Sequence, residues 1–452
     1  MKDFTCVCLP KLTCEFMAVR NIQSIYQYFE SARSQLTSFI RHIAIKDIGF
    51  HYILWPQMWL MEANMIRVAV IGTGNISRLH ISSYLAFHDR CRIVAFADIY
   101  PEKCREKAEE FGLEVEIFDS HKELLGRSDI DLVSICTPPF CHAEIAVEFL
   151  NAGKHVIVEK PMAASLEECD RMLEEAGRSG KVLAVVAQNR FKDPVMNLKR
   201  VLDSGKIGRI VHAQVDSFWW RGHCYYDLWW RGTWEKEGGG CTLNHAVHHI
   251  DMLAWMMGRP LSVQALLSNT SHDNAEVEDI SIAALQYPGG AVAQITSSVI
   301  HHGEEQQVIF QGERARISAP WKVSAMVSKS NGFPENDPQL EKELNDYYNS
   351  LPKLKYIDHK GEIDDVLTAA ETGGQPLITG RSGRLTIEII TAIYKAGFER
   401  KTIDLPIAKD DPYYTVKGIR ENAIHFYEKK SSVVNLGSGQ EITVGSDYTN
   451  NK

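Results

Sequence analysis

The sequence lacks the features that mark membrane, secreted and nucleic-acid-binding proteins. It has no uninterrupted run of roughly 18 apolar residues, and its N-terminus does not place a basic segment before an apolar one. No block of lysines or arginines occurs, and the formal net charge at pH 7 is -9. These absences argue against a membrane protein and a nucleic-acid binder. We therefore expect a cytoplasmic protein whose partner is a small molecule.

The ten cysteines lack a repeated spacing. Several lie inside apolar strand or helix patterns, which is typical of reduced thiols in a cytoplasm. Cys6, Cys8 and Cys14 form a denser group, but three cysteines without a fourth ligand do not predict a zinc site.

The length of 452 residues, with 44% hydrophobic and 24% charged residues, favours a globular protein of two domains. We expect a Rossmann domain with a doubly wound parallel sheet over residues 65–189. A substrate-binding α/β domain on a mostly antiparallel open sheet should follow over residues 190–408. Residues 409–452 then form a C-terminal tail that is mobile at its end. Residues 1–64 fit poorly with this plan, and we expect them to be an added or mis-assigned N-terminal extension.

Alternating strand and helix patterns carry the fold prediction. In the first domain they predict strands at 67–71, 93–97, 130–136, 155–158 and 181–188, with helices at 101–111, at 142–152 and after Ser165. In the second domain alternating runs predict strands at 209–219, 262–268, 279–286, 291–299 and 307–310. Residues 331–365 are polar and proline-broken, so we expect a loop region with short helices at most. A helix over 384–398 closes the domain.

The run IGTGNIS, residues 71–77, follows the first predicted strand. Gly72 permits a tight turn, Gly74 lets the backbone approach a pyrophosphate, and the amides of Asn75 and Ile76 open the next helix toward the anion. The third position of the GxGxxG pattern is Ser77, which is small enough to pack a helix close to a strand. The run predicts a dinucleotide site if a carboxylate follows at the right distance.

Asp98 meets that condition, because it ends an apolar run about 20 residues beyond the glycines. Its carboxylate would accept hydrogen bonds from the ribose hydroxyls and repel a 2′-phosphate. Ile99 and Tyr100 offer no arginine to neutralise such a phosphate, which favours NAD over NADP. Alternatively, Asp98 simply begins the turn before the next helix.

Three further segments contain residues suited to catalysis: CTPPFCH at 136–142, EKP at 159–161 and GGGCTLNHAVHHID at 238–251. Together with IGTGNIS they resemble the Gfo/Idh/MocA family, the relatives of glucose-fructose oxidoreductase and inositol dehydrogenase, over roughly residues 65–405. WRGTWEKEGGG at 230–240 is similar to the branch that acts on sugars and their derivatives. GRSGRLTIEIITAIYKA at 380–396 is similar to the closing helix of the family.

The resemblance implies that Lys160 is catalytic, with Glu159 beside it at the cofactor. Near an oxidised nicotinamide the lysine would have a lowered pKa and would align the substrate hydroxyl. The alternative is a solvated lysine at a strand end. His248 corresponds to the histidine that acts as general base on the sugar hydroxyl.

Asn244 takes the place that many members give to aspartate, and it would orient His248 or substrate hydroxyls because an amide cannot take a proton. Asn244 and His248 stand four residues apart on a predicted helix, so both should project from one face. His245 and His249 have the same spacing, which zinc-binding helices use, but neither a glutamate nor a third ligand accompanies them. We therefore predict no metal and expect these two histidines to pack in the structure.

Thr137, Pro138 and His142 correspond to the turn that the family places under the nicotinamide ribose. On the residues alone, the prolines could form a rigid loop and His142 could cap a helix. Arg190, Tyr226, Trp230 and Arg231 are candidates for the sugar pocket, because aromatic faces stack on pyranose rings and guanidinium groups bind hydroxyls or carboxylates. Aromatic core packing explains Trp219, Trp220 and Trp229 equally well.

These residues predict an NAD-dependent oxidoreductase that moves a hydride between a secondary hydroxyl of a sugar, cyclitol or glycoside and nicotinamide. Two other functions stay open: redox-assisted glycoside cleavage with a tightly bound, recycled NAD, and a non-catalytic sugar or nucleotide sensor. A half-apolar sheet face would suit a homo-oligomer, either a dimer or a tetramer.

Overall fold

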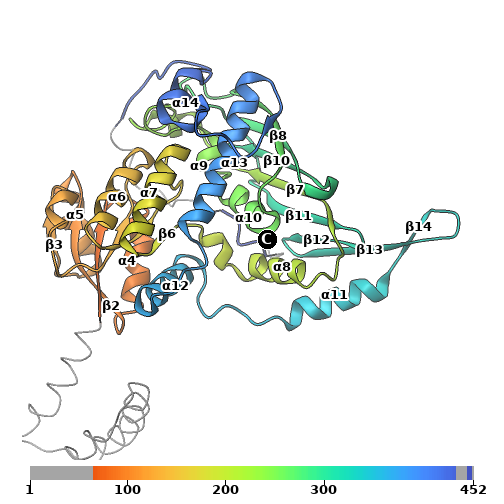
Figure 1. The fold of residues 1–452 in the computed structure, drawn as a ribbon, viewed down its shortest axis with the longest axis horizontal. Helices are drawn as coiled ribbons and strands as arrows, with labels where there is room; N and C mark the ends of the chain where they lie inside the picture. The colour runs from red at the N-terminus through yellow and green to blue at the C-terminus, as the bar shows by residue number, and fades with distance from the viewer. Residues whose placement is uncertain (1–64, 434–444, 450–452) are drawn as a thin grey trace, which may run out of the picture. The chain divides into compact units, whose positions relative to one another are not determined.

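A computed structural model describes residues 65–433 and 445–449, and Figure 1 shows their arrangement. The chain divides after Asn64 into two units, and the description concerns the second. The predicted N-terminal extension lies outside the described residues. No helix in the described part of the chain is both long enough and apolar enough to cross a membrane.

The first sheet is parallel and has the strand order β3-β2-β1-β4-β5-β6. This is the doubly wound arrangement, in which the strand order reverses between β1 and β4 and leaves a ligand crevice at the carboxyl ends. Its strands are β1 (Ile66–Ile71), β2 (Cys91–Ala97), β3 (Glu116–Phe118), β4 (Leu132–Ile135), β5 (His155–Val158) and β6 (Leu183–Val185). Its helices are α4 (Ser77–Leu85), α5 (Pro101–Phe111), α6 (His142–Asn151) and α7 (Leu166–Ser179).

Local sequence signals set several of these boundaries. Gly112 ends α5 with a φ of 62°, in the left-handed region that glycine adopts without steric cost. Ser165 opens α7 by accepting a hydrogen bond from the Glu168 amide, while Glu168 accepts one from the Ala164 amide. These two hydrogen bonds place the start of the helix after Ser165, as the sequence pattern predicts.

The second sheet has nine strands in the order β14-β13-β12-β11-β7-β10-β9-β8-β15. All neighbours are antiparallel except β7 and β10. The strands are β7 (Ile210–Phe218), β8 (Ser262–Ser268), β9 (Ile280–Gln286), β10 (Val292–Ser298), β11 (Gln306–Gly312), β12 (Ala315–Ala319), β13 (Lys322–Ser328), β14 (Pro334–Asn336) and β15 (Ile403–Asp404). The two predicted sheet types are therefore confirmed, although β12 to β15 were not predicted.

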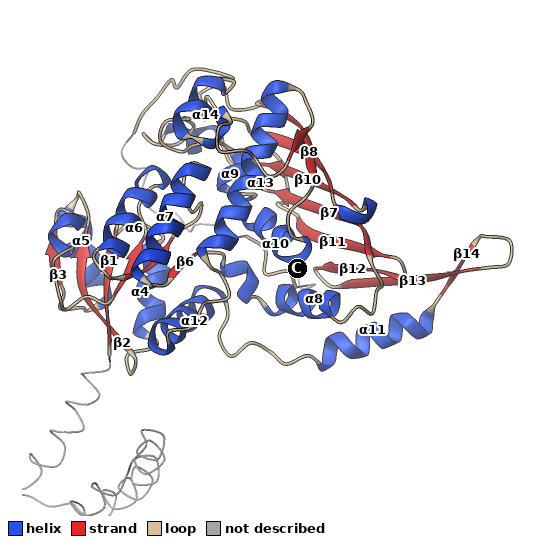
Figure 2. Ribbon diagram, viewed as in Figure 1, coloured by secondary structure: helices blue, strands red, loops and turns tan. Residues whose placement is uncertain are grey.

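Helices that follow β6 in the chain contact both sheets (Figure 2). They are α8 (Asp193–Asp203), α9 (Cys241–Asn244), α10 (Val247–Met257), α11 (Pro338–Ser350), α12 (Asp358–Thr372), α13 (Gly380–Glu399) and α14 (Val416–Asn422). Helix α13 contacts β8 of the second sheet as well as α7 and β6 of the first. It therefore joins the two sheets behind the pocket described below.

The prediction of a loop region over 331–365 is wrong, because this stretch holds α11 and the start of α12. Asp337 caps α11, and only Leu340 and Leu344 are buried along that charged helix, so its apolar stripe is short. Helix α12 packs against α4 of the first sheet and buries Ile363 and Val366 there.

The described tail residues 445–449 contact strand β11, where the Ser446 amide donates a hydrogen bond to Gln306 Oε1 at 2.9 Å, and helix α10. Tyr448 is 1% exposed, and its hydroxyl lies 2.8 Å from Nε2 of His249. Residues 434–444 and 450–452 lie outside the description, so mobility at the end of the chain stays a prediction.

Candidate active site

The glycine turn after β1 leaves room for a ligand. Gly72 has a φ of +84°, and a Cβ there would lie 2.8 Å from the Cys136 carbonyl oxygen, so only glycine lets this turn approach β4. No described atom lies within 4 Å of a Cβ built at Gly74, and both Gly74 and Asn75 are exposed. Ile76 precedes α4, and the Ser77 hydroxyl donates to the Gly74 carbonyl oxygen at 2.7 Å. The helix N-terminus thus opens toward free space, as a pyrophosphate site requires.

Asp98 lies beside this turn at the end of β2. Its Oδ2 accepts hydrogen bonds from the Thr73 amide at 2.8 Å and the Thr73 hydroxyl at 3.2 Å. Its Oδ1 accepts one from the Tyr100 amide at 3.0 Å, so it also begins the following turn. The carboxylate is only half-buried and is held at the edge where a ribose would lie.

The loop after β4 is tied to the loop after β5 by His142. This buried histidine has Nε2 2.8 Å from the Thr137 carbonyl oxygen and Nδ1 2.8 Å from the Pro161 carbonyl oxygen. Pro138, half-buried, precedes the short turn that leads to α6. Thr137 Oγ1 is buried without a partner among the described residues. His142 therefore holds the two loops together, and the Thr137 hydroxyl is the group left for a ligand.

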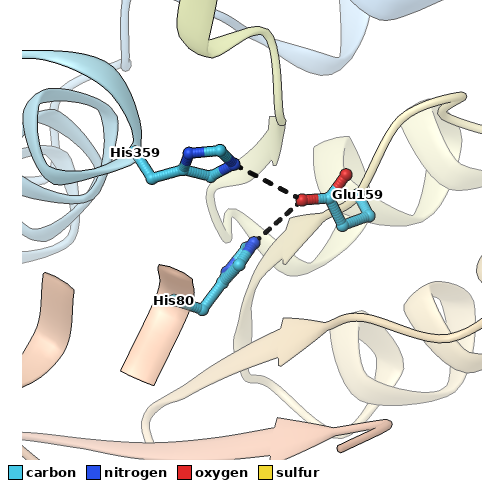
Figure 3. A group of neighbouring side chains, drawn as sticks. All are labelled: His80, Glu159 and His359. Carbon is cyan, nitrogen blue, oxygen red and sulfur yellow. Dashed lines mark hydrogen bonds and ion pairs between the residues drawn. The ribbon is translucent and has the colours of Figure 1, made fainter. Parts of the chain in front are cut away.

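Glu159 is buried at the end of β5 in a network with two histidines (Figure 3). Its Oε1 lies 3.0 Å from Nε2 of His80 on α4 and 3.8 Å from Nε2 of His359 on α12. Its Oε2 accepts a hydrogen bond from the Lys160 amide at 3.1 Å. Despite its burial, the pKa of Glu159 is lowered to about 2, because the hydrogen bond and positive charge from His80 favour the carboxylate. Oε2 thus orders the turn through the Lys160 amide, and Oε1 is bound to His80; a role of Glu159 at the cofactor stays a prediction.

Sequence reasoning missed His80 and His359, because their partner is distant in the chain. The three ligand atoms lie within 4.8 Å of one another, a grouping that could hold a metal ion. Glu159 already accepts a hydrogen bond from the Lys160 amide and is bound to His80. The absence of a metal stays a prediction.

Lys160 and His248 line the same pocket. It lies between the β5 turn, α10 and α13, and its other walls include Val185, Ala187, Asp251 and Ile387. Lys160 Nζ donates a hydrogen bond to the Asn244 carbonyl oxygen at 3.1 Å. Two residues far apart in the sequence are therefore brought together, as the resemblance implied.

Burial gives both groups unusual acidity. It lowers the pKa of Lys160; the Glu159 carboxylate opposes this, while the Arg231 guanidinium adds to it. Burial also lowers the pKa of His248 well below its ordinary value, and the nearby Lys160 ammonium adds to the effect. The imidazole is therefore neutral at pH 7 and able to accept a proton.

Asn244 has a different place from the one predicted. The expected single helix is broken, because α9 ends at Asn244 and α10 begins only at Val247. The Asn244 side-chain amide donates to the carbonyl oxygens of Gly239 at 2.9 Å and Gly240 at 3.3 Å. Its side chain thus holds the glycine turn, and its backbone carbonyl positions Lys160.

Arg190, a candidate for the sugar pocket, is engaged in a buried ion pair. Its guanidinium donates two hydrogen bonds of 2.7 Å to the Asp251 carboxylate, and its side chain is 3% exposed. Because Asp251 lines the pocket, the pair shapes the pocket wall and leaves little of Arg190 for a ligand.

The remaining pocket candidates lie in the segment before α9. Tyr226 is buried, and its hydroxyl has no partner within the described ranges. The Arg231 guanidinium carbon lies 4.2 Å from the centre of the Trp230 ring and 4.1 Å from that of Tyr225. Arg231 also donates to the buried Glu237 at 2.9 Å. Tyr225 and Glu237 were not predicted, since nothing in their spacing distinguishes them from core residues.

The two histidines that were expected to pack in the structure, His245 and His249, differ. His249 is a core residue, with Nδ1 2.9 Å from the Ser217 hydroxyl oxygen and Nε2 bonded to Tyr448. His245 lies at the site instead, with Nε2 3.3 Å from the Tyr225 hydroxyl oxygen and Nδ1 buried without a partner among the described residues.

The open glycine turn, the carboxylate at the end of β2 and the unpartnered Thr137 hydroxyl fit a dinucleotide. Comparison with known proteins supports the same class. The model of the oxidoreductase family with the NAD-binding Rossmann fold matches residues 66–187. The chain is thus an oxidoreductase with an NAD-binding Rossmann domain. The GFO/IDH/MocA C-terminal domain matches residues 195–318, and the protein belongs to the GFO/IDH/MocA family.

Individual relatives include dehydrogenases of cyclitols and sugars. Myo-inositol 2-dehydrogenase of Thermotoga maritima is 25% identical over 75% of this chain and 98% of its own length. The 1-carboxy-3-chloro-3,4-dihydroxycyclohexa-1,5-diene dehydrogenase of Comamonas testosteroni is 31% identical, over 54% of this chain and 60% of its own. The WlbA dehydrogenase of Bordetella pertussis, whose structure was solved with NADH and UDP-GlcNAcA, is 29% identical and has a TM-score of 0.66. The match covers 76% of this chain and 99% of that protein.

Proposed function

We propose that the protein is an NAD-dependent dehydrogenase that moves a hydride between a secondary hydroxyl of a sugar, cyclitol or glycoside and the cofactor. The observation that carries the proposal is that Lys160 and His248 line one pocket at the carboxyl end of β5. The named relatives, which include an inositol dehydrogenase and a protein bound to a nucleotide sugar, support the substrate class. NAD, when bound, supplies the nicotinamide ring that takes up the hydride.

In this proposal His248 takes the proton of the reacting hydroxyl. Its imidazole is neutral because burial disfavours the charged form. The O–H bond breaks toward the ring nitrogen as the C–H bond releases its hydride, so proton and electron pair leave separately.

Lys160 orients the hydroxyl oxygen and stabilises the negative charge that develops on it. An ammonium has three N–H donors, and the Asn244 carbonyl oxygen takes one of them. The others are free to donate to the substrate. Apolar walls such as Val185 and Ile387 exclude water that would weaken these interactions.

The experiment is a screen of sugars, cyclitols, glycosides and nucleotide sugars for NADH formation, with product measured in parallel. We expect NADH in proportion to the oxidised product. Product without net NADH would indicate redox-assisted cleavage, and ligand binding without product would indicate a sensor. The same screen with NADP tests the cofactor, since Asp98 should exclude the 2′-phosphate.

A further inference from the structure

Two arginines meet around one tyrosine in the segment that follows β7. The guanidinium carbon of Arg231 lies 4.1 Å from the Tyr225 ring centre, and that of Arg221 lies 5.6 Å from it. Arg221 also lies 5.2 Å from the ring centre of Trp219. Both arginine side chains are largely buried, at 16% and 19% exposure. Aromatic faces therefore hold two cations in a small space.

This arginine pair adjoins the reacting groups. The Tyr225 hydroxyl lies 3.3 Å from Nε2 of His245. His245 directly follows Asn244, whose carbonyl oxygen accepts the hydrogen bond from Lys160. A continuous chain of contacts thus leads from Lys160 to both guanidinium groups.

Two nitrogens of this group have no hydrogen-bond partner in the described parts of the chain. Arg231 Nε and His245 Nδ1 are both buried without a partner, and His245 as a whole is 6% exposed. A buried donor left unpaired costs free energy, so sites that keep such donors are typical of ligand recognition. His245 is neutral because burial lowers its pKa well below the ordinary value, and so its Nδ1 can carry the hydrogen.

A third feature of the group is its set of cations. The carboxylates that contact the two arginines are Glu237, 2.9 Å from Arg231, and Glu304, 2.7 Å from Arg221. Lys160 adds a third cation, whose neighbour Glu159 is bound to His80 and to the Lys160 amide. The group thus gathers three cations, of which the two arginines are each paired with a carboxylate.

We propose that Arg221, Arg231 and His245 form a subsite for a carboxylate on the substrate whose hydroxyl reacts at Lys160 and His248. The substrate is then an acidic sugar, a uronate or its glycoside, or a cyclic hydroxy acid. A guanidinium group is a planar set of donors that matches a carboxylate, and His245 adds a donor from another direction. The subsite rests on the proposed function for its orientation toward the hydroxyl.

The test compares matched pairs that differ only in the acid group: glucuronate with glucose, and galacturonate with galactose, free and as methyl glycosides. Calorimetry measures their binding to the NADH-loaded enzyme, and NADH formation measures turnover with NAD. We expect the acid of each pair to bind about 10- to 100-fold more tightly, the range of charge-assisted hydrogen bonds. Equal binding within every pair would overturn the subsite.

Two variants test which residues produce the preference for the acids. Arg221→Gln and the double variant Arg231→Gln with Glu237→Gln should remove the acid preference, measured as the ratio of the dissociation constants within each pair; the second change of the double variant avoids an unpaired buried carboxylate. Arg209→Gln, which breaks an exposed ion pair with Glu313, is the matched control and should keep the preference. A preference that survives both subsite variants would contradict the assignment.

The outcomes separate the subsite from the proposed function. Tight binding of the acids without NADH formation would contradict the proposed function but support the subsite. Turnover of neutral sugars with no acid preference would support the proposed function but contradict the subsite. If glucose 6-phosphate binds as tightly as glucuronate, the subsite accepts anions in general, which would contradict its assignment to a carboxylate.

Discussion

The two walls of the pocket are built differently. The first wall, the turn Glu159–Pro161, has its polar groups bound to the protein: Glu159 to His80 and to the Lys160 amide, and the Pro161 carbonyl oxygen to His142. The second wall includes Val247 and His248, and the segment that leads to it, residues 221–246, keeps Arg231 Nε and His245 Nδ1 without partners among the described residues. The first wall is thus held in place by hydrogen bonds within the protein, whereas in our proposal the second leaves donors for the substrate.

The largest effect should follow from changing the first wall. Lys160→Met removes the ammonium at the reacting oxygen, and we expect turnover to fall below detection while NADH still binds. A steady-state assay measures turnover, and a fluorescence titration measures NADH binding. Lys154→Met, at the opposite end of β5, is the control and should remain active. An active Lys160→Met enzyme would remove Lys160 from the mechanism.

The adjacent pair His248 and His249 sharpens the comparison on the second wall. His248→Asn should lower kcat by about 10²- to 10⁴-fold, because it removes a general base, with little change in stability. His249→Asn should keep kcat but lower the free energy of unfolding by about 1–3 kcal/mol, because the Ser217 and Tyr448 hydroxyls lose a buried partner. Steady-state kinetics and urea unfolding of both variants give the result, and reversed effects would contradict the assignment.

The pH profile tests the state of His248. Its pKa is lowered in the folded protein, so the ring stays neutral as the pH falls through the ordinary histidine range near 6.5. We expect kcat for alcohol oxidation to be retained through that range and lost only below it. A decrease in kcat centred at or above pH 6.5 would show an unshifted base.

A smaller effect is expected at the cofactor carboxylate. Asp98→Asn should weaken NAD binding by about tenfold, since charge-assisted hydrogen bonds to the ribose become neutral ones, with kcat nearly unchanged. The ratio of the dissociation constants for NAD and NADP should shift toward NADP. An unchanged ratio would mean that Asp98 only orders the turn with Thr73 and Tyr100.

The smallest effect on chemistry should come from a surface far from both walls. Leu266 and Ile282 face each other across β8 and β9 on the exposed side of the second sheet, at 70% and 50% exposure. We expect this face to join subunits, so that Ile282→Glu shifts the mass measured by light scattering toward the monomer without changing kcat. The same mass for both proteins would locate any interface elsewhere.

The parts of the fold with local signals were predictable. The bounds of α5, β5 and β8 agree with the sequence patterns, because caps and alternation act over a few residues. Helices α11 and α12 were not predicted, because charged residues and prolines mask their short apolar stripes. The break between Asn244 and His248 also carries no sequence signal.

Within the site, the resemblance located Lys160 and His248, but not what surrounds them. His80 and His359 contact Glu159 only after folding, and the group around Tyr225 depends on packing between segments. Arg190 was predicted to bind the sugar because its ion-pair partner Asp251 stands 61 residues away, so the sequence does not reveal the pair.

The central claim is tested most directly by a structure of the enzyme with NADH and a substrate identified in the screen. The account predicts that Lys160 Nζ and a ring nitrogen of His248 both lie within about 3.2 Å of the same substrate oxygen. A substrate whose reacting oxygen is out of reach of either group would contradict it.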